Sequence, residues 1–108
     1  MAEPQPWSIR EAGAGDIAAL SLVASATFLE TFAGVLPGAA IVVHCATAYA
    51  PDRFADYFAR GSRAWILEAT PGGAPVGFAQ LAGPDLPGAG PGDVELKRIY
   101  LLSRFHGS

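Results

Sequence analysis

The segment 95–108 (ELKRIYLLSRFHGS) holds the residues whose types and spacing are best suited to chemistry. An apolar strand in its first part runs into a polar turn that contains Gly107. A turn of this kind commonly leads into a helix whose first backbone amides bind an anion. The position after the strand therefore favours an anion-binding turn at His106, Gly107 and Ser108. Taken alone, the same three residues form a surface turn in most proteins.

Charged and apolar side chains are distributed unevenly along the strand that the sequence predicts over 94–102. An extended strand places alternate residues on opposite faces. One face carries Glu95, Lys97, Ile99 and Leu101, and the other carries Leu96, Arg98, Tyr100 and Leu102. Both faces are charged at the start of the strand and apolar later. We therefore expect the strand to pass from a wet cleft into the core, with Glu95 at the mouth of the cleft.

The residues before this strand predict the elements that position it. A short strand over 7–10 is followed by glycines and by Asp16, which is a good N-cap for a helix over 17–32. One face of that helix carries apolar residues spaced by three and four positions, namely Ile17, Leu20, Ala24 and Phe28. We expect this face to pack on a sheet.

Two further helices are predicted after the GVLPG sequence that ends the first. The second helix is apolar and covers residues 39–49. Pro51 cannot continue it, because proline lacks an N–H and clashes with the preceding turn, so a third helix begins there. The apolar stripe of the third helix comprises Phe54, Tyr57 and Phe58. Gly61 is a natural residue for its C-terminal end.

The remaining residues predict a β-meander. Runs of β-branched and aromatic residues at 65–69 and 76–82 flank the sequence TPGGAP, which is typical of a hairpin. A loop rich in glycine and proline over 83–93 leads to the last strand. The order of one strand, three helices and three strands predicts an α+β fold in which the last strand is antiparallel to the one before it.

Composition limits the classes of function. With 108 residues the chain fits one domain over residues 7–108, after a flexible tail over residues 1–6. The net charge of −3 leaves no basic surface for nucleic acid. The N-terminus lacks the apolar segment of a signal peptide, and the apolar run 39–43 is too short to cross a membrane. A single cysteine, Cys45, agrees with a soluble, cytoplasmic protein.

His44 and Cys45 are of the residue types that bind metal ions. They are adjacent, so on a helix their side chains point about 100° apart and cannot form a two-ligand site by themselves. We therefore expect no metal. Cys45 is more typical of a small buried residue than of a nucleophile.

The run ELKRIYLL, with HGS after it and TFLETF upstream, resembles the GNAT superfamily of acyl-CoA-dependent N-acetyltransferases. The pyrophosphate loop of that family reads Q/R-x-x-G-x-G/A. The motif places His106 at the Gln/Arg position and both of its glycines after Ser108. Within the superfamily, the chain is most similar to spermine/spermidine-type bacterial acetyltransferases. From about Trp7 onward, the resemblance implies the N-terminal portion of the family's mixed-sheet fold, truncated at the pyrophosphate loop.

The resemblance implies acetyl-CoA as co-substrate and no metal. In the family, the backbone of the corresponding strand pairs with the pantetheine arm and polarises the acetyl carbonyl, which implicates Ile99, Tyr100 and Leu101. His106, Gly107 and Ser108 would begin the pyrophosphate site. Because the rest of the loop motif follows Ser108, we expect residues 1–108 alone to bind acetyl-CoA weakly or not at all.

Glu95 stands at the position of the family's general base, which takes a proton from the cationic acceptor amine. The alternative for Glu95 is a surface charge paired with Lys97 or Arg98. The family shapes its acceptor pocket near the end of the first helix, which implicates Phe28 and Thr31, and a solvated helix face is the alternative there. The implied acceptor is an amine of a small molecule, a polyamine or a peptide.

A second class of function fits the same residues. The chain can be read as a truncated, catalytically inactive piece of the fold that acts only as a folding or dimerisation module. A last strand without a further neighbour is an unpaired edge, and such edges pair with other chains. This alternative predicts a homodimer.

Overall fold

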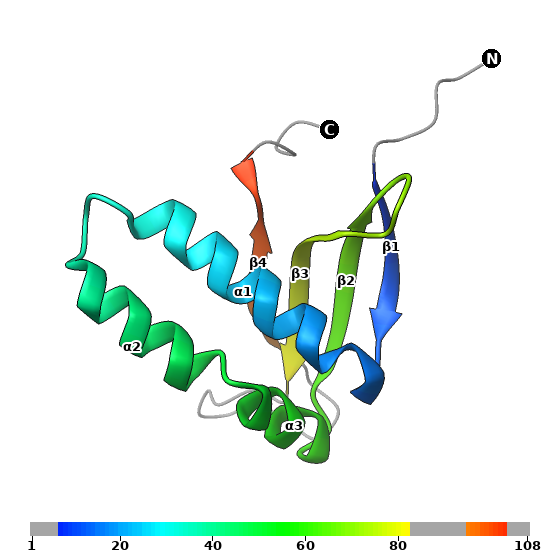
Figure 1. Cartoon of the computed structure of the whole chain (residues 1–108). Helices are drawn as coiled ribbons and strands as arrows, with labels where there is room; N and C mark the ends of the chain where they lie inside the picture. Colours follow the sequence, from blue (N-terminus) through cyan, green and yellow to red (C-terminus); the bar gives the residue numbers. More distant parts are fainter. Residues whose placement is uncertain (1–6, 83–94, 104–108) are drawn as a thin grey trace.

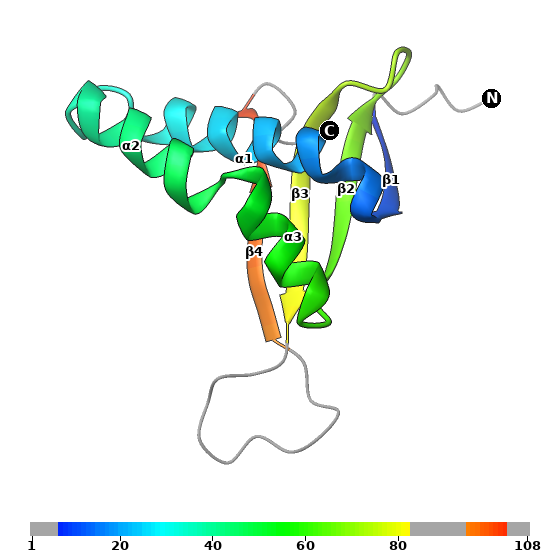
Figure 2. The same cartoon turned by 60° about the horizontal axis from the view of Figure 1, so that its bottom comes forward.

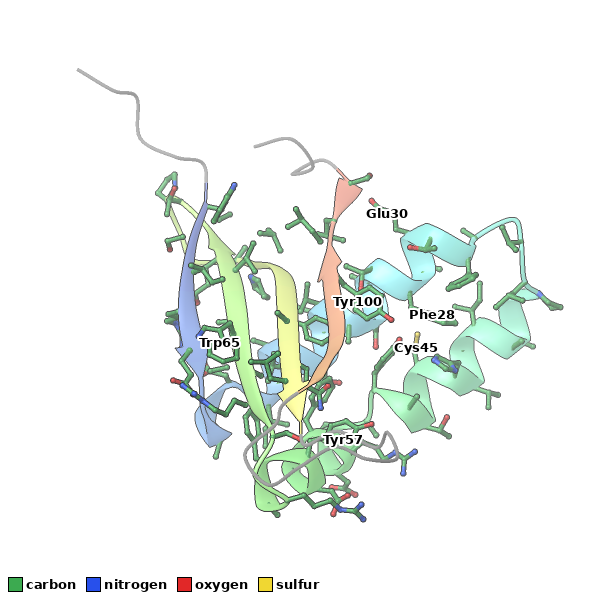
Figure 3. The ribbon with its side chains drawn as sticks, turned by 180° about the vertical axis from the view of Figure 1, so that it is seen from behind. Phe28, Glu30, Cys45, Tyr57, Trp65 and Tyr100 are labelled. Carbon is green, nitrogen blue, oxygen red and sulfur yellow. The ribbon has the colours of Figure 1, made fainter. Side chains whose placement is uncertain are left out.

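The fold is a four-stranded sheet with its helices on one face (Figures 1 and 3). The computed structural model describes residues 7–82 and 95–103, and for residues 82 and 95–99 it describes the backbone. In chain order the elements are β1 (Trp7–Ala12), a short 3₁₀ turn (Ala14–Asp16), α1 (Ile17–Phe32), α2 (Gly38–Ala48), α3 (Pro51–Ala59), β2 (Arg63–Ala69), β3 (Pro75–Ala82) and β4 (Glu95–Leu101). This order confirms the predicted α+β class. The predicted tail over 1–6 and the predicted loop over 83–93 lie outside the described residues.

The strands are ordered β1-β2-β3-β4, and each pair of neighbours is antiparallel. β3 pairs with β4 from Gly77 opposite Leu101 to Ala82 opposite Glu95, which confirms the predicted meander. The parallel pairing that a mixed sheet requires is not found among the described strands. Within the described residues, β1 and β4 are therefore the two edges of the sheet.

A register shift interrupts the pairing of β3 with β4. Gln80 lies opposite Arg98 and Leu81 lies opposite Leu96, so the register skips Lys97 of β4. An extra residue in one strand forms a β-bulge, which breaks the strict alternation of faces. The assignment of β4 residues to two faces by simple alternation stays a prediction, because the side chains of residues 95–99 lie outside the described part of the structure.

The core lies between α1 and the middle of the sheet. Leu20 and Ala24 of α1 are fully buried, in one cluster with Ile66 of β2 and Phe78 of β3. Phe28 was predicted on the same helix face, but it is only partly buried at the margin of this cluster. The predicted apolar face of α1 is thus core along its first part only.

Asp16 does not cap α1 through its side chain, contrary to the prediction. Its carboxylate instead accepts two hydrogen bonds from the Arg10 guanidinium, at 2.8 and 3.0 Å, and one from the Gly13 N–H, at 2.9 Å. Arg10 also donates to Glu68 of β2 at 3.0 Å. A bidentate guanidinium binds a carboxylate more strongly than a neutral amide does, so the acid turns toward β1.

Other element ends differ from the prediction by one or two residues. β1 continues to Ala12, because this residue still pairs with β2 and is buried in the core. α2 begins and ends one residue earlier than predicted, and Tyr49 leaves the helix to become buried. α3 begins at Pro51 as predicted. Gly61, at φ +89°, follows its end in the left-handed conformation that glycine adopts without strain.

Among the described residues, one helical stretch, Ala14–Phe32, is long and apolar enough to cross a membrane by length and composition alone. The core helix of a globular protein passes the same test. α1 lies across the sheet (Figure 1), and its own residues Leu20, Val23 and Ala24 are buried. The described structure therefore accounts for the apolar residues in the first half of α1 as core.

Candidate functional site

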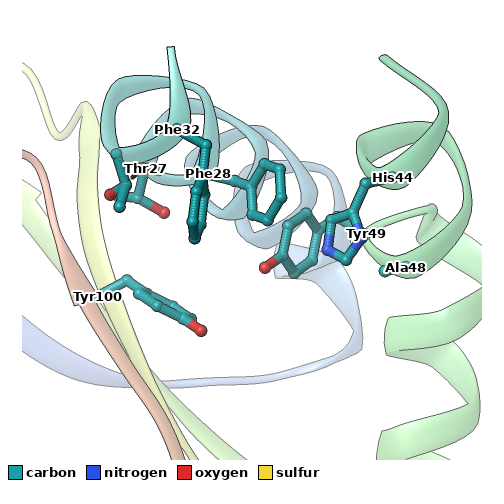
Figure 4. A pocket seen from close by; sticks show the side chains of 8 residues that line it. Thr27, Phe28, Phe32, His44, Ala48, Tyr49 and Tyr100 are labelled. Atoms are coloured by element: carbon teal, nitrogen blue, oxygen red, sulfur yellow. Dashed lines mark hydrogen bonds between the residues drawn. The ribbon is translucent and has the colours of Figure 1, made fainter. Parts of the chain in front are cut away.

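A cleft of about 440 Å³ opens between α1, α2 and β4 (Figure 4). Its described lining comprises Thr27, Phe28, Thr31 and Phe32 of α1, His44 and Ala48 of α2, Tyr49 after α2, and Tyr100 of β4. The volume falls within the range of small-molecule sites, about 300–1,000 Å³. Most of these side chains are aromatic, so the cleft is a concave, largely apolar site, and we take it as the candidate functional site.

The course of α1 explains where the cleft forms. Figure 2 shows that α1 and α2 continue past β4, an edge strand of the described sheet. After α1 the chain turns at Gly34, whose φ of +83° is one that glycine adopts without strain, and α2 then runs back beside α1. The second half of α1 therefore faces α2 and the end of β4, with the cleft between them.

Four rings form an aromatic cluster on the helical side of the cleft: Phe28, Phe32, His44 and Tyr49, called the Phe28 cluster below. The Phe28 ring stacks on His44 at 4.1 Å and 15°, and its centroid lies 4.5 Å from Phe32 and 5.8 Å from Tyr49. His44 meets Tyr49 edge-on at 5.2 Å. Aromatic pairs contribute about 0.5–1.5 kcal/mol beyond the area they bury. The rings thus hold one another and make a preformed wall.

The threonine hydroxyls of the cleft are already engaged as donors. The Thr27 hydroxyl lies 2.9 Å from the Val23 carbonyl and 3.0 Å from the Ala24 carbonyl. The Thr31 hydroxyl donates to the Thr27 carbonyl at 2.8 Å. Because a hydroxyl has one proton to donate, these two side chains can only accept hydrogen bonds from a ligand.

Tyr100 forms the opposite wall. Its ring packs 5.4 Å from the buried Phe78 ring, and the residue remains 40% exposed. Figure 4 shows Tyr100 facing the Phe28 cluster across the cleft. A Cβ at Gly77 would lie 2.7 Å from the Tyr100 carbonyl oxygen and 2.8 Å from Cδ1 of Leu101. The glycine at position 77 therefore lets β4 approach β3 closely, which sets the position of Tyr100.

Glu30 ties the end of α1 to the residue that follows β4 by two positions. Its carboxylate accepts one hydrogen bond from the Ser103 N–H at 2.7 Å and one from the Ser103 hydroxyl at 2.9 Å. Figure 3 shows Glu30 beside the end of β4. Glu30 is exposed, yet it has a specific partner, so the end of α1 is more than a solvated helix face.

The pKa shifts of the described residues belong to the other edge of the sheet. Hydrogen bonds from Arg10, and then from the Gly13 N–H, hold the pKa of Asp16 at about 2. The Arg63 guanidinium lowers the pKa of Glu11. Among the described residues, no three His, Cys, Asp or Glu side chains come together to hold a metal ion. In its described part, the cleft therefore offers rings and hydroxyls for binding.

The structure brings together three of the predicted site residues. Phe28, Thr31 and Tyr100 all line the cleft. Leu101 follows Tyr100 in β4 and is partly buried, and the backbone of Ile99 lies opposite Ala79. The contact of β4 with acetyl-CoA stays a prediction.

Glu95 lies at the other end of β4 from the cleft residue Tyr100. The backbone of Glu95 pairs with Ala82. At a rise of about 3.3 Å per residue, Glu95 lies about 16 Å from Tyr100 along β4. Its side chain is outside the described part of the structure, so its role as a base stays a prediction. His106, Gly107 and Ser108 lie outside the described residues.

The predicted site omits the α2 side of the cleft. From the sequence, His44 is only a metal-ligand candidate that the helix geometry excludes, and Tyr49 is only the end of a helix. A signal for both exists in the sequence, because two apolar helices joined by a short loop with glycine and proline pack against each other. Phe28 and Phe32, four positions apart, mark the side of α1 that faces α2.

No protein-family model matches the chain, and no curated protein matches it. Among solved structures, the chain is similar to the PaiA N-acetyltransferase from Thermoplasma acidophilum in complex with coenzyme A, with a TM-score of 0.73 and 20% sequence identity. It is also similar to a GCN5-related N-acetyltransferase (aminotransferase, class-II) from Rhodopseudomonas palustris, with a TM-score of 0.65 and 24% identity.

The two alignments cover 94% and 99% of this chain, but only 62% and 59% of the two solved chains. The chain therefore spans about six-tenths of the length of the structures it resembles. At these identities the likeness establishes the fold. The chain has the α+β fold of the corresponding part of two N-acetyltransferases.

Proposed function

We propose that this chain supplies the acceptor side and part of the cofactor cleft of an acetyl-CoA-dependent N-acetyltransferase of the GNAT superfamily. The observation that carries the proposal is the position of the cleft. It lies against Tyr100 of β4, the strand that the family resemblance assigns to acetyl-CoA. The fold supports the proposal, because the chain shares it with two N-acetyltransferases, one of them crystallised with coenzyme A.

β4 is suited to bind an extended cofactor arm. It is an edge of the described sheet, with β3 as its one neighbouring strand among the described elements. Edge strands bind extended ligands by adding them as a further strand. We propose that the backbone around Ile99, Tyr100 and Leu101 contacts the pantetheine arm. In this proposal, His106, Gly107 and Ser108 begin the pyrophosphate site.

The acceptor amine must lose a proton before it reacts. An alkylammonium with a pKa of about 10 is protonated at neutral pH. We propose that Glu95 takes this proton, directly or through a water. The free nitrogen then bonds to the thioester carbonyl carbon as the C–S bond breaks. The nitrogen releases its second proton to the sulfur, so that the products are an acetamide and the coenzyme A thiol.

The acceptor side of the proposal is the cleft itself, with Phe28 and Thr31 in contact with the acceptor. The proposed acceptor is an amine of a small molecule, a polyamine or a peptide. We propose that the protein acts in the cytoplasm, since its single cysteine, Cys45, is a free thiol.

The proposal is tested by incubating the full-length protein with acetyl-CoA and amines of the three classes, and by measuring the release of coenzyme A thiol. We expect release that depends on the amine. Glu95→Gln should slow it at neutral pH and slow it less at pH about 10, where the amine deprotonates unaided. Glu11→Gln, on the opposite edge strand β1, is the matched control.

Two outcomes would contradict parts of this proposal. A folded protein that releases no thiol with any amine would contradict acetyl transfer. Equal rates for Glu95→Gln and the wild type at neutral pH would show that another group is the base.

The edge position of β4 favours a second candidate function, a dimerisation module without activity. An exposed edge strand pairs readily with the same strand of a second copy. Sedimentation analysis would then show a dimer. A dimer that dissociates after a proline replaces an edge residue of β4, together with no thiol release, favours this candidate over the enzyme.

A further inference from the structure

The described lining of the cleft has few groups that could bind a charge. It includes no acid, lysine or arginine. The hydroxyls of Thr27 and Thr31 already donate to helix carbonyls. What remains is mostly ring carbon, with one imidazole and two phenols. A ligand therefore gains mainly by burying apolar surface there.

We infer that the cleft binds amine acceptors that carry an aromatic ring, in preference to polyamines. The ring of the ligand lies against the Phe28 cluster, where offset and edge contacts between rings are favourable. The amine extends toward Tyr100 and β4. This orientation rests on the proposed function, which puts the thioester beside β4.

A polyamine would be poorly matched to the same lining. It is charged along its whole length at neutral pH, and an ammonium that leaves water requires a carboxylate or several hydrogen-bond acceptors. A cation can also bind over the open face of an aromatic ring. One face of the Phe28 ring is covered by His44, which stacks on it at 4.1 Å. The described lining thus replaces only a small part of the hydration that a polyamine would lose.

The size and shape of the cleft suit one ring system with a short amine-bearing chain. Its volume of about 440 Å³ lies in the lower part of the range for small-molecule sites, about 300–1,000 Å³. Figure 4 shows the hydroxyl ends of Tyr49 and Tyr100 directed into the space between them. These two phenols are polar groups at the place where the amine of such a ligand would pass.

The inference is tested by titrating the protein, without acetyl-CoA, with 2-phenylethylamine, butylamine and spermidine, and by following backbone amide signals in NMR spectra. Butylamine is the control ligand, because it has the same ammonium group as 2-phenylethylamine but no ring. We expect 2-phenylethylamine to bind about tenfold or more tightly than butylamine, since its ring buries more apolar surface. Spermidine should bind no more tightly than butylamine.

Two variants show whether binding takes place in the cleft. Thr31→Trp fills the cleft from an exposed helix position and should weaken binding of 2-phenylethylamine by about tenfold or more. His44→Ala removes one ring of the Phe28 cluster, against which the ring of the ligand lies, so it should also weaken binding of 2-phenylethylamine. Val43→Ala changes a neighbouring residue that is 61% exposed and lies outside the described lining, so its affinity should equal that of the wild type. Circular dichroism shows whether each variant is folded. If Thr31→Trp does not fold, the affinity of His44→Ala decides whether binding takes place in the cleft.

Equal affinities for 2-phenylethylamine and butylamine would overturn the inference. So would tighter binding of spermidine in the cleft, or binding of 2-phenylethylamine that neither variant weakens. The binding experiments do not use acetyl-CoA, so a failure of this inference can be told apart from a failure of the proposed function. An aryl amine that binds in the cleft but is never acetylated contradicts the proposed function alone. Acetylation of spermidine without binding of the aryl amine contradicts the inference alone.

Discussion

The two halves of α1 are both rich in apolar residues, but they lie in different surroundings. In the first half, Leu20 and Ala24 are 0% exposed and Val23 is 1% exposed, in the core above the sheet. In the second half, Phe28 and Phe32 are partly buried and line an open cleft. The difference follows from the width of the described sheet, because α1 continues past β4 (Figure 2).

An apolar helix face becomes core only where a second layer covers it. Beyond β4 the layer beside α1 is α2, which meets it through the Phe28 cluster. The space toward Tyr100 stays open. Substitutions in the two halves should therefore change different properties: stability in the first half, and ligand binding in the second.

The largest expected effect is the loss of stability in the first half of α1. Leu20→Ala removes a fully buried side chain and leaves a cavity, so it should lower the free energy of unfolding by about 2–5 kcal/mol. Leu22→Ala, two residues away and 61% exposed, should change it by less than about 0.5 kcal/mol. Urea unfolding followed by circular dichroism measures both. Equal effects would show that the first half of α1 is not buried as described.

The next effect concerns the strand that supports the cleft. Gly77→Ala places a Cβ within 2.7 Å of the Tyr100 carbonyl oxygen, so β4 has to shift away from β3. Overpacking of this kind costs about 1–3 kcal/mol, and the shift should also move the Tyr100 signals in NMR spectra. Gly13→Ala is the control, since a Cβ at Gly13 meets no atom within 4 Å. An unchanged stability for Gly77→Ala would mean that β4 lies further from β3.

A smaller effect is expected where the end of α1 meets the residues after β4. Glu30→Ala removes both hydrogen bonds to Ser103, each of them worth about 0.5–1.5 kcal/mol at most in this exposed setting. The Ser103 amide should then exchange its hydrogen faster. Ser103→Ala, which keeps the bond from the backbone N–H, should have the weaker effect on stability. If the Ser103 amide exchanges as slowly in Glu30→Ala as in the wild type, the hydrogen bonds between Glu30 and Ser103 do not form in solution.

The smallest effect is electrostatic and lies far from the cleft, at β1. Arg10 and the Gly13 N–H hold the pKa of Asp16 at about 2, below its ordinary value of 3.8. A depressed carboxyl pKa means that the unfolded chain binds the proton more tightly. The stabilisation is therefore present above pH 3.8 and is lost as the pH falls toward about 2. Thermal unfolding between these pH values should show this loss, and Asp16→Asn should reduce it. An identical pH dependence in Asp16→Asn would contradict the assignment.

Much of the fold could be predicted because its signals are local. The spacing of Leu20 and Ala24, the proline at position 51 and the glycine at position 61 act within a few residues of where they stand. The meander followed from its short connections, and the structure confirms it. For the candidate site, the family resemblance pointed to Phe28, Thr31 and Tyr100; these residues line one cleft, and their contact with substrate or cofactor stays a prediction.

Periodicity and turn residues act at short range, so the order and type of the elements and the apolar face of α1 could be predicted without a structure. Which part of that face is core depends on how far the sheet extends beneath α1, and this is known only from the folded chain. The tertiary structure also decided that Arg10 engages Asp16, that β4 carries a bulge, and that His44 completes the Phe28 cluster. Glu30 and Ser103 stand 73 residues apart, and no local pattern links them. Their contact exists because the end of α1 and the end of β4 meet in space.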